Sequence, residues 1–158
     1  MDMIELSKKN NQIYLRKALD SDRGLLFEWV NDLDTRKNAF NEELISYEEH
    51  CKWFECMMKS TDQLQFIMMD GEEPIGQIRL IIKGEKADID YSIKASKRGM
   101  SYGKIIINLL KEKIRCEKPE IMTLCARVKP RNVASLSCFV KNGFKERYLQ
   151  LEYNLSEY

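Results

Sequence analysis

The stretch Asp88-Ile-Asp-Tyr-Ser-Ile-Lys94, Ala95-Ser-Lys-Arg98, Gly99-Met-Ser-Tyr-Gly103 decides the fold. Its first part alternates apolar with polar side chains, which is the period of a half-buried strand. After Gly103 apolar residues recur at three- and four-residue steps, which is one face of a helix. A strand, a glycine loop and a helix in succession aim backbone N–H groups and a helix N-terminus at one point. The stretch therefore predicts a phosphate site, although both glycines also suit an ordinary turn and helix cap.

The composition is that of an ordinary globular chain. Its 158 residues are 44% hydrophobic and 32% charged, so we expect residues 1–158 to form a single domain. A net charge of +1 gives no basic excess for nucleic acid or an anionic membrane, and neither partner is expected. No apolar run resembles a membrane span or a signal peptide, which favours a cytoplasmic location.

Cysteine and histidine usage bears on disulfides and metals. The five cysteines are odd in number and lack paired short spacings, which favours free, mostly buried thiols over a disulfide framework. A zinc site needs clustered ligands, and His50 is the one histidine in the sequence. We therefore expect no metal.

Further strands and helices surround the opening stretch. Ser46 and Glu49 have the form of a capping box, which predicts the start of a helix. The polar segment 34–41 predicts an irregular or short helical excursion. Strands are predicted at 13–18, 64–69, 75–82, 88–93, 121–128 and 145–155. Helices are predicted at 20–32, 46–59, 102–116 and 132–142. This order indicates a mixed sheet flanked by helices.

Two motifs in the second half of the chain form a recognisable pair. The first is Arg98-Gly-Met-Ser101-Tyr-Gly103, and the second is Asn132-Val-Ala-Ser135 followed by Phe139-Val-Lys141-Asn-Gly143-Phe144. In order and separation they resemble the motifs Arg-Gly-x-Gly-x-Gly and Asn-x-x-Ser…Tyr-x-Lys-x-Gly-Phe of the GCN5-related N-acetyltransferase (GNAT) family, with Ser101 replacing the middle glycine. The resemblance covers nearly the whole chain. It implies an α+β (mixed α/β) GNAT fold, with a mostly antiparallel sheet of six to seven strands and about four flanking helices.

The resemblance also implies acetyl-CoA as cosubstrate and suggests where it binds. Loop backbone amides would hold the CoA pyrophosphate at the helix N-terminus, and the end of the preceding strand would hydrogen-bond the pantetheine arm. Lys141 would pair with a CoA phosphate, unless it is a solvated lysine on a helix face. The implied cofactor-binding residues are Ser92, Ile93, Arg98, Gly99, Met100, Ser101, Tyr102, Gly103, Lys104, Asn132, Ser135, Phe139 and Lys141.

The implied reaction is direct attack of a primary amine on the acetyl thioester. Many family members carry a tyrosine acid where this chain has Phe139, which has no proton to donate, so the acid is water, another side chain or absent. Candidate bases are Asp88 and Asp90, on the strand face of Ser92, and His50, whose ordinary pKa suits a base. Each has a structural alternative, as a salt-bridged strand carboxylate or a polar residue on a helix face.

The N-terminal helices usually shape the acceptor site in this family. Residues 27–54 are similar to acetyltransferases of bacterial nonulosonic acid and surface-polysaccharide biosynthesis, which modify the 4-amino group of a UDP-linked aminodideoxy sugar. Aromatic faces stack on sugar or uracil rings, and asparagine, arginine and histidine give directional contacts, although aromatic stripes on helices usually belong to the core. The implied acceptor-binding residues are Trp29, Asn31, Arg36, Phe40, His50 and Trp53.

Other functions stay open at the level of sequence. One is acetylation of protein N-termini or ribosomal proteins, for which Glu42-Glu43 and Glu48-Glu49 would supply an acidic groove. Another is a non-catalytic acetyl-CoA-binding module, for which Phe139 and Ser101 argue. Antibiotic or polyamine acetylation expects an acidic pocket and a negative chain, which the net charge of +1 does not fit. A homodimer is compatible with the family, but no interface signature is visible.

Overall fold

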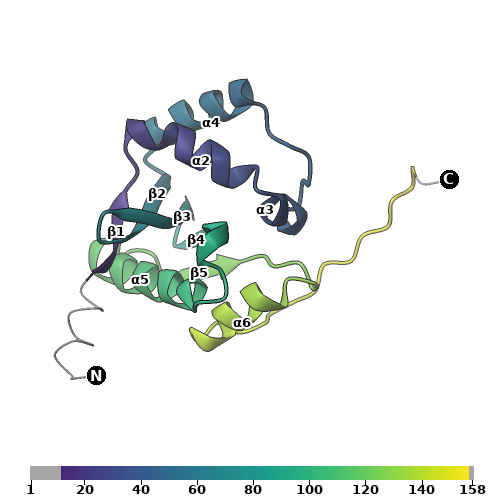
Figure 1. The fold of residues 1–158 in the computed structure, drawn as a ribbon. Helices are drawn as coiled ribbons and strands as arrows, with labels where there is room; N and C mark the ends of the chain where they lie inside the picture. The colour runs from purple at the N-terminus through teal and green to yellow at the C-terminus, as the bar shows by residue number, and fades with distance from the viewer. Residues whose placement is uncertain (1–11, 157–158) are drawn as a thin grey trace.

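The computed structural model describes residues 12–156. Its centre is an open sheet with helices on both faces, and the chain leaves the body in an extended segment at its C-terminal end (Figure 1). The strands, in their order across the sheet, are β1 (Ile13–Lys17), β2 (Gln63–Asp70), β3 (Glu73–Lys83), β4 (Lys86–Ile93) and β5 (Thr123–Ala126). The helices are α2 (Arg23–Val30), α3 (Leu33–Asn38), α4 (Tyr47–Lys59), α5 (Tyr102–Glu117) and α6 (Val133–Lys141), with 3₁₀ turns η1 (Asp20–Asp22) and η2 (Ala95–Lys97).

The sheet is mixed and mostly antiparallel, which confirms the predicted fold class. Strands β1 to β4 pair antiparallel with their neighbours, and β5 runs parallel to β4. Within residues 12–156 the sheet has five strands instead of six to seven. Five α-helices flank it instead of about four, because the polar segment 34–41 lies partly in the short helix α3.

The strand predicted at 145–155 is wrong. This segment is extended but pairs with none of the described strands, and Leu149, Leu151 and Leu155 are 85%, 90% and 85% exposed. Alternation gives a preference for extended backbone, whereas a strand also needs an edge to pair with. The chain leads away from the sheet after α6, so its own sheet does not supply that edge (Figure 1).

The two apolar faces of β2 explain why helices cover both sides of the sheet. Phe66 packs on one face with the apolar stripe of α5. Ile67, the next residue, packs on the other face with α2 and α4. Both side chains are fully buried, and they belong to the continuous apolar run 66–69 of β2, which is typical of a strand that is covered on both faces.

Local capping fixes the ends of the helices that carry functional side chains. The Ser46 hydroxyl accepts the Glu49 N–H at 3.2 Å, and the Glu49 carboxylate accepts the Ser46 N–H at 3.3 Å, which confirms the predicted capping box of α4. Helix α6 ends in a Schellman motif, with Gly143 at a φ of +87° and the Phe144 N–H bonded to the Phe139 carbonyl. The Asn142 amide then joins α6 to α5 by donating to the Lys104 carbonyl at 3.0 Å.

The cysteines are free, as expected, but most of them are not buried. All five are free, but Cys56 and Cys116 are exposed and the other three are half-buried, so the expectation that most are buried is wrong. Cys125 lies on the edge strand β5, and the other four cysteines lie on helices. None of the helices within residues 12–156 is long and apolar enough to cross a membrane.

Candidate active site

A cleft of about 640 Å³ lies between the N-terminal helices, the open end of β4 and the glycine loop. It brings together most of the residues expected to bind the two substrates. From the acceptor set it is lined by Trp29, Arg36, His50 and Trp53. From the cofactor and base sets it is lined by Asp90, Ser92, Ile93, Arg98, Gly99, Ser101, Tyr102, Gly103, Asn132, Ser135 and Phe139.

Six expected site residues do not line the cleft: Asn31, Phe40, Asp88, Met100, Lys104 and Lys141. The Asp88 carboxylate accepts from Lys83 at 2.7 Å, which is the salt-bridged alternative for this residue. Lys141 and Lys104 are exposed to solvent on their helices. The Asn31 amide exchanges two hydrogen bonds of 2.8 Å with the Ile45 backbone, so it fixes the segment between α3 and α4.

Strands β4 and β5 separate beside the cleft. Their pairing runs from Lys86 opposite Thr123 to Ile89 opposite Ala126 and ends there. The remaining residues of β4, Asp90 to Ile93, pair only with β3 in the described part of the chain. Their edge toward β5 therefore offers backbone N–H and C=O groups to an extended ligand, in the manner of an added strand.

The glycine loop is the second part of the candidate site, beside the free edge of β4, and it is the part suited to an anion. Gly99 has a φ of +76°, and Ser101, the N-cap of α5, has a φ of +66° without a side-chain cap bond. Helix α5 spans 16 residues, and its first N–H groups lack intrahelical partners. At Gly103 a Cβ would lie 3.0 Å from Cys138 Sγ, so only glycine allows α5 to approach α6 this closely. Both glycines thus have structural roles, and the loop still presents its amides to the cleft.

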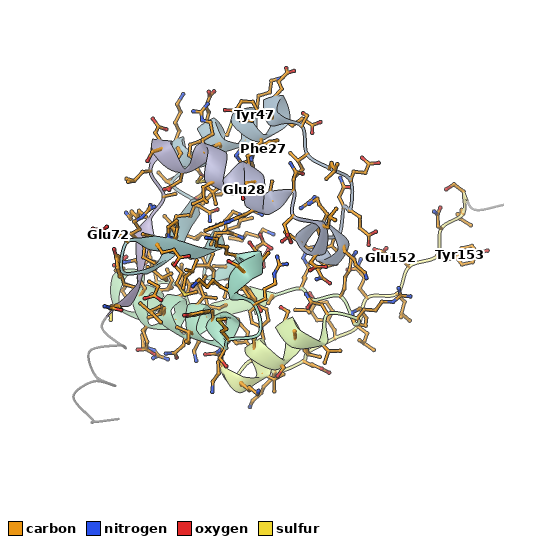
Figure 2. The ribbon with its side chains drawn as sticks, in the orientation of Figure 1. Phe27, Glu28, Tyr47, Glu72, Glu152 and Tyr153 are labelled. Carbon is orange, nitrogen blue, oxygen red and sulfur yellow. The ribbon has the colours of Figure 1, made fainter. Side chains whose placement is uncertain are left out.

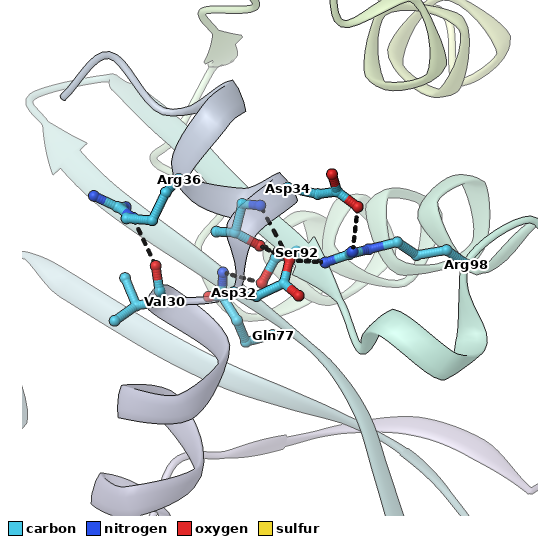
Figure 3. Close-up of polar contacts among 8 residues, drawn as sticks. Val30, Asp32, Asp34, Arg36, Gln77, Ser92 and Arg98 are labelled. Atoms are coloured by element: carbon cyan, nitrogen blue, oxygen red, sulfur yellow. Dashed lines mark hydrogen bonds and ion pairs between the residues drawn. The ribbon is translucent and has the colours of Figure 1, made fainter. Parts of the chain in front are cut away.

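The Arg98 side chain points to the acceptor helices. Its guanidinium donates to Asp32 at 2.6 Å and forms an ion pair with Asp34 at 3.1 Å, at the start of α3 (Figure 3). Burial raises the pKa of Asp32, but hydrogen bonds from Arg98 and Thr35 outweigh it and hold the pKa below its ordinary value. Arg98 therefore joins the glycine loop to α3.

Asp90 is an ionisable carboxylate on the floor of the cleft. Its side chain is 65% exposed, toward the cleft, and Arg79 lies 3.7 Å away. The surrounding protein raises the pKa of Asp90 by desolvation, and Arg79 and Arg36 oppose the shift. Ser92, on the same strand face, accepts a hydrogen bond from Gln77 at 3.2 Å (Figure 3). A carboxylate with a raised pKa facing a ligand cleft has the properties of a general base.

His50 is held as a buried residue. It is 2% exposed, and its Nε2–H donates to the Arg23 carbonyl at 2.8 Å. Burial lowers the pKa of His50, with the backbone bond opposing, so the ring stays neutral. It also packs 5.3 Å from the Phe27 ring and 5.5 Å from the Trp53 ring; Figure 2 labels Phe27 and Tyr47 on the neighbouring α2 and α4, where their rings meet at 5.1 Å. This environment gives His50 a packing role at the wall of the cleft.

Three cleft arginines have different attachments. Arg36 donates to the Val30 carbonyl at 2.6 Å and to the Asn41 carbonyl at 2.9 Å. Arg79 stacks over the Trp53 ring at 5.3 Å, and its buried Nε has no hydrogen-bond partner among the described residues. Arg127 lies over the exposed Phe40 ring at 4.9 Å. The sequence interpretation missed Arg79 and Arg127, although an arginine within the apolar run of β3 was a signal.

Tyr91 is a third residue that the sequence interpretation missed. Its ring meets the Phe139 ring at 5.6 Å and 72°, and its hydroxyl lies beside Ser135 and Cys138. Burial raises the pKa of the phenol, so Tyr91 stays protonated. A tyrosine in the inward register of Ile89 and Ile93 was the available signal, because a buried hydroxyl needs a partner.

Metal ligands are not grouped in the described residues. No cluster of three or more histidine, cysteine, aspartate or glutamate side chains within residues 12–156 could hold a metal ion.

Two solved structures illustrate the similarity of this fold to known enzymes. Spermidine N-acetyltransferase from Vibrio cholerae, in complex with CoA and spermine, has a TM-score of 0.79 and 19% identity over 88% of this chain and 84% of that chain. Aminoglycoside acetyltransferase AAC(6')-Ib, in complex with ribostamycin and coenzyme A, has a TM-score of 0.76 and 21% identity over 86% and 84%. At this identity the similarity shows the fold alone.

A domain from Methanocaldococcus jannaschii also shares the fold, with a TM-score of 0.75 and 20% identity over 85% of this chain and 89% of that chain. No curated protein sequence matches the chain. The model of the family described as "Acetyltransferase (GNAT) domain" matches residues 12–145, which is most of the chain. This protein therefore belongs to the GNAT family of acetyltransferases.

Proposed function

We propose that this acetyl-CoA-dependent N-acetyltransferase modifies the amino group of a small acceptor that also carries negative charge. The acceptor class that fits best is a sugar nucleotide, with the 4-amino group of a UDP-linked aminodideoxy sugar as the nucleophile. The observation that carries this proposal is the charge of the cleft. It is lined by two carboxylates, Asp34 and Asp90, and by five cationic side chains, Arg36, Arg79, Lys97, Arg98 and Arg127.

The pairing of these charges leaves a net positive acceptor side. Asp34 is paired with Arg98, and Asp90 lies against Arg79. Arg36 and Arg127 have no carboxylate partner among the ion pairs of the described residues. A diphosphate gains charge-assisted hydrogen bonds from guanidinium groups, whereas a polyamine or aminoglycoside is repelled by them. The proposal thus separates this chain from the ligands named for the spermidine and aminoglycoside enzymes that share its fold.

The residues present fit acetyl-CoA in two respects. The edge of Asp90 to Ile93 suits the pantetheine arm, and the amides of the glycine loop and the N-terminus of α5 suit the pyrophosphate. Acetyl-CoA supplies an acyl carbon that an amine attacks, with a thiol as leaving group.

Two side chains handle protons in this proposal. The Asp90 carboxylate takes one proton from the acceptor ammonium group, which frees the nitrogen lone pair, and its raised pKa makes it a stronger base than an ordinary carboxylate. The Tyr91 hydroxyl donates a hydrogen bond to the leaving sulfur without losing its proton, because its pKa is raised. As the amide forms, the attacking nitrogen loses a second proton to solvent, and the departing thiolate, whose pKa of about 8.5 makes it a stable leaving group, takes a proton from solvent. Tyr91 would thus supply part of the acid function that Phe139, which has no proton to donate, cannot perform.

The deciding experiment is a thiol-release assay with acetyl-CoA and a panel of acceptors. We expect kcat/KM for a UDP-4-amino-4,6-dideoxy sugar to exceed that for spermidine and kanamycin by about 100-fold or more, which corresponds to roughly 3 kcal/mol. Preferential turnover of N-terminal peptides would favour the protein-modifying alternative. Acetyl-CoA binding without turnover of any acceptor would favour the non-catalytic alternative.

A matched pair of variants tests the charge argument directly. Arg127→Gln should raise KM for the sugar nucleotide about tenfold with little change in kcat, because it removes a ground-state contact to the acceptor. Arg131→Gln removes an exposed arginine outside the cleft and should change neither constant. Equal effects of both changes would contradict a specific anion contact at Arg127.

A further inference from the structure

A row of hydrogen-bonded polar side chains crosses the sheet on the floor of the cleft. Gln65 on β2 donates its amide N–H to Oε1 of Gln77 on β3 at 2.7 Å. Gln77 in turn donates its own amide N–H to Oγ of Ser92 on β4 at 3.2 Å (Figure 3). All three residues line the cleft, and the strands that carry them are neighbours in the sheet. The hydrogen bonds therefore run in one direction, from β2 to β4.

The row begins at a buried position beside apolar residues. Gln65 is 5% exposed, and Ile67, the next residue on the same strand face, is fully buried in the core under α2 and α4. The amide nitrogen of Gln65 also donates to the backbone carbonyls of Phe66 and Ile78, each at 3.4 Å. A buried amide that is satisfied in this way holds one orientation. Gln65 therefore fixes which end of the Gln77 amide is turned toward β4.

The Ser92 hydroxyl keeps a proton that it can donate. A serine hydroxyl has one O–H donor and two acceptor lone pairs. The oxygen of Ser92 accepts from Gln77, and its O–H donates to no group within residues 12–156. Ser92 is half-buried and lines the cleft. Its O–H is therefore available to an oxygen atom of a bound acceptor.

Asp90 and Ser92 lie next to each other on the cleft face of β4. They are two residues apart on one strand, which puts their side chains about 7 Å apart on the same face. A hydrogen bond from each side chain spans about 3 Å. The remaining gap between the two bound groups of the acceptor is short, and it suits an amine and a hydroxyl on adjacent carbons. A polyamine has no such hydroxyl, whereas amino sugars commonly carry one.

We propose that the Ser92 hydroxyl selects acceptors by donating a hydrogen bond to a hydroxyl on the carbon next to the reacting amine. The acceptor class is thus a vicinal amino alcohol. Gln77 and Gln65 are positioning residues that keep the Ser92 proton turned toward the cleft. This inference rests on the proposed function, because it takes Asp90 as the group that receives the ammonium proton of the same acceptor.

Selectivity between two small amines tests the contact without a nucleotide. The probes are trans-2-aminocyclohexanol and cyclohexylamine, which differ by one hydroxyl, in a thiol-release assay of the full chain with acetyl-CoA. The measured quantity is the ratio of their kcat/KM values, and its change between variants cancels the different basicity of the two amines. We expect the ratio to fall about tenfold or more in Ser92→Ala and to stay near the wild-type value in Ser92→Thr, which keeps a hydroxyl. Damage to the fold would lower both kcat/KM values alike and leave the ratio unchanged.

Glutamine variants test the positioning row. Gln77→Met and Gln65→Met remove the amide at similar side-chain volume, and each should lower the ratio about threefold or more while the dissociation constant of acetyl-CoA stays the same. Gln63→Met is the matched control, because Gln63 shares the strand face of Gln65 but lies outside the cleft and has a buried Oε1 without a partner among the described residues. Its ratio should equal that of the wild type.

Three results overturn the proposal: an unchanged ratio in Ser92→Ala, an equal ratio in Gln77→Met and Gln63→Met, or no turnover of the amino alcohol by the wild type. They are distinct from failure of the proposed acceptor. A chain that ignores the sugar nucleotide but shows the Ser92-dependent ratio loses only the sugar-nucleotide assignment. A chain that acetylates the sugar nucleotide with an unchanged ratio in Ser92→Ala loses only the Ser92 contact.

Discussion

The backbone of Ser101 has a φ of +66°, which lies in the left-handed region where glycine is normally found, although Ser101 carries a Cβ. The left-handed conformation costs roughly 1–2 kcal/mol for a residue with a side chain. Glycine would remove this cost, but its greater conformational freedom in the unfolded chain would lower the free energy of unfolding by roughly 0.5–1 kcal/mol. We expect Ser101→Gly to raise the free energy of unfolding by about 0.5–1 kcal/mol in urea titrations.

Ser96→Gly is the matched control for this change. Ser96 lies in the exposed turn η2 and does not have a positive φ, so glycine there should lower the free energy of unfolding. A loss of stability in Ser101→Gly would show that the serine side chain contributes more to the loop than its strain costs.

The part of the activity that depends on Asp90 should vary with pH. The carboxylate acts as a base when ionised, and desolvation raises its pKa, so kcat/KM of the wild type should fall as the pH drops through this raised value, above the ordinary 3.9 or so of an aspartate. Asp90→Asn should lower kcat by about 10²–10⁴-fold and abolish this acid limb, while the dissociation constant of acetyl-CoA stays nearly constant.

Asp88→Asn is the control for Asp90, because Asp88 shares its strand face but lies outside the cleft and pairs with Lys83. Its turnover and pH profile should match those of the wild type. Wild-type turnover in Asp90→Asn would remove that residue as the base.

At the scale of elements, helix α4 depends on its capping box to place Trp53 and His50 at the cleft. Ser46→Ala removes the acceptor for the Glu49 N–H and should lower the free energy of unfolding by about 1 kcal/mol. Thermal unfolding measures the loss. Glu48→Gln, which breaks only the exposed pair with Lys52, should change it by a few tenths of a kcal/mol at most. A larger effect of Glu48→Gln would contradict the capping account.

The sequence was sufficient to predict those helices and strands whose faces and ends depend on neighbouring residues. The alternation of β4, the apolar stripe of α5 and the capping box of α4 were all predicted and confirmed. Segment 145–155 has an equally regular alternation, yet it is no strand in the described chain, because pairing depends on an edge that sequence does not reveal. Strand β5 is four residues long where eight were predicted, since it separates from β4 at the cleft.

At the scale of the whole molecule, only part of the site could be predicted from the sequence. The glycine loop and the end of β4 lie where the motif predicted, because a motif encodes a local backbone path. Arg79 and Tyr91 come to the cleft through the packing of β3 and β4 on distant helices. Asn31 looked like a ligand contact and instead fixes the backbone at Ile45, since a polar side chain can serve either the ligand or the fold.

The charge of the whole cleft gives a prediction about salt. An anionic acceptor attracted by Arg36, Arg79 and Arg127 loses attraction as ions screen the charges, with a Debye length of about 10 Å at 0.1 M salt and 3 Å at 1 M. We expect KM for the sugar nucleotide to rise several-fold over this range, as measured by steady-state kinetics, with kcat nearly unchanged. A KM that falls with salt would indicate a cationic acceptor.

The Arg98 bridge has a consequence for how the two substrates affect each other. It joins the glycine loop to Asp32 and Asp34, so we expect order gained in one half of the cleft to be transmitted to the other. We expect CoA to tighten acceptor binding and the acceptor to tighten CoA binding by the same factor, because coupling between two sites is reciprocal. Calorimetry with unacetylated CoA measures that factor, and Arg98→Gln should bring it close to one. Each substrate would then bind more tightly when the other is already in place.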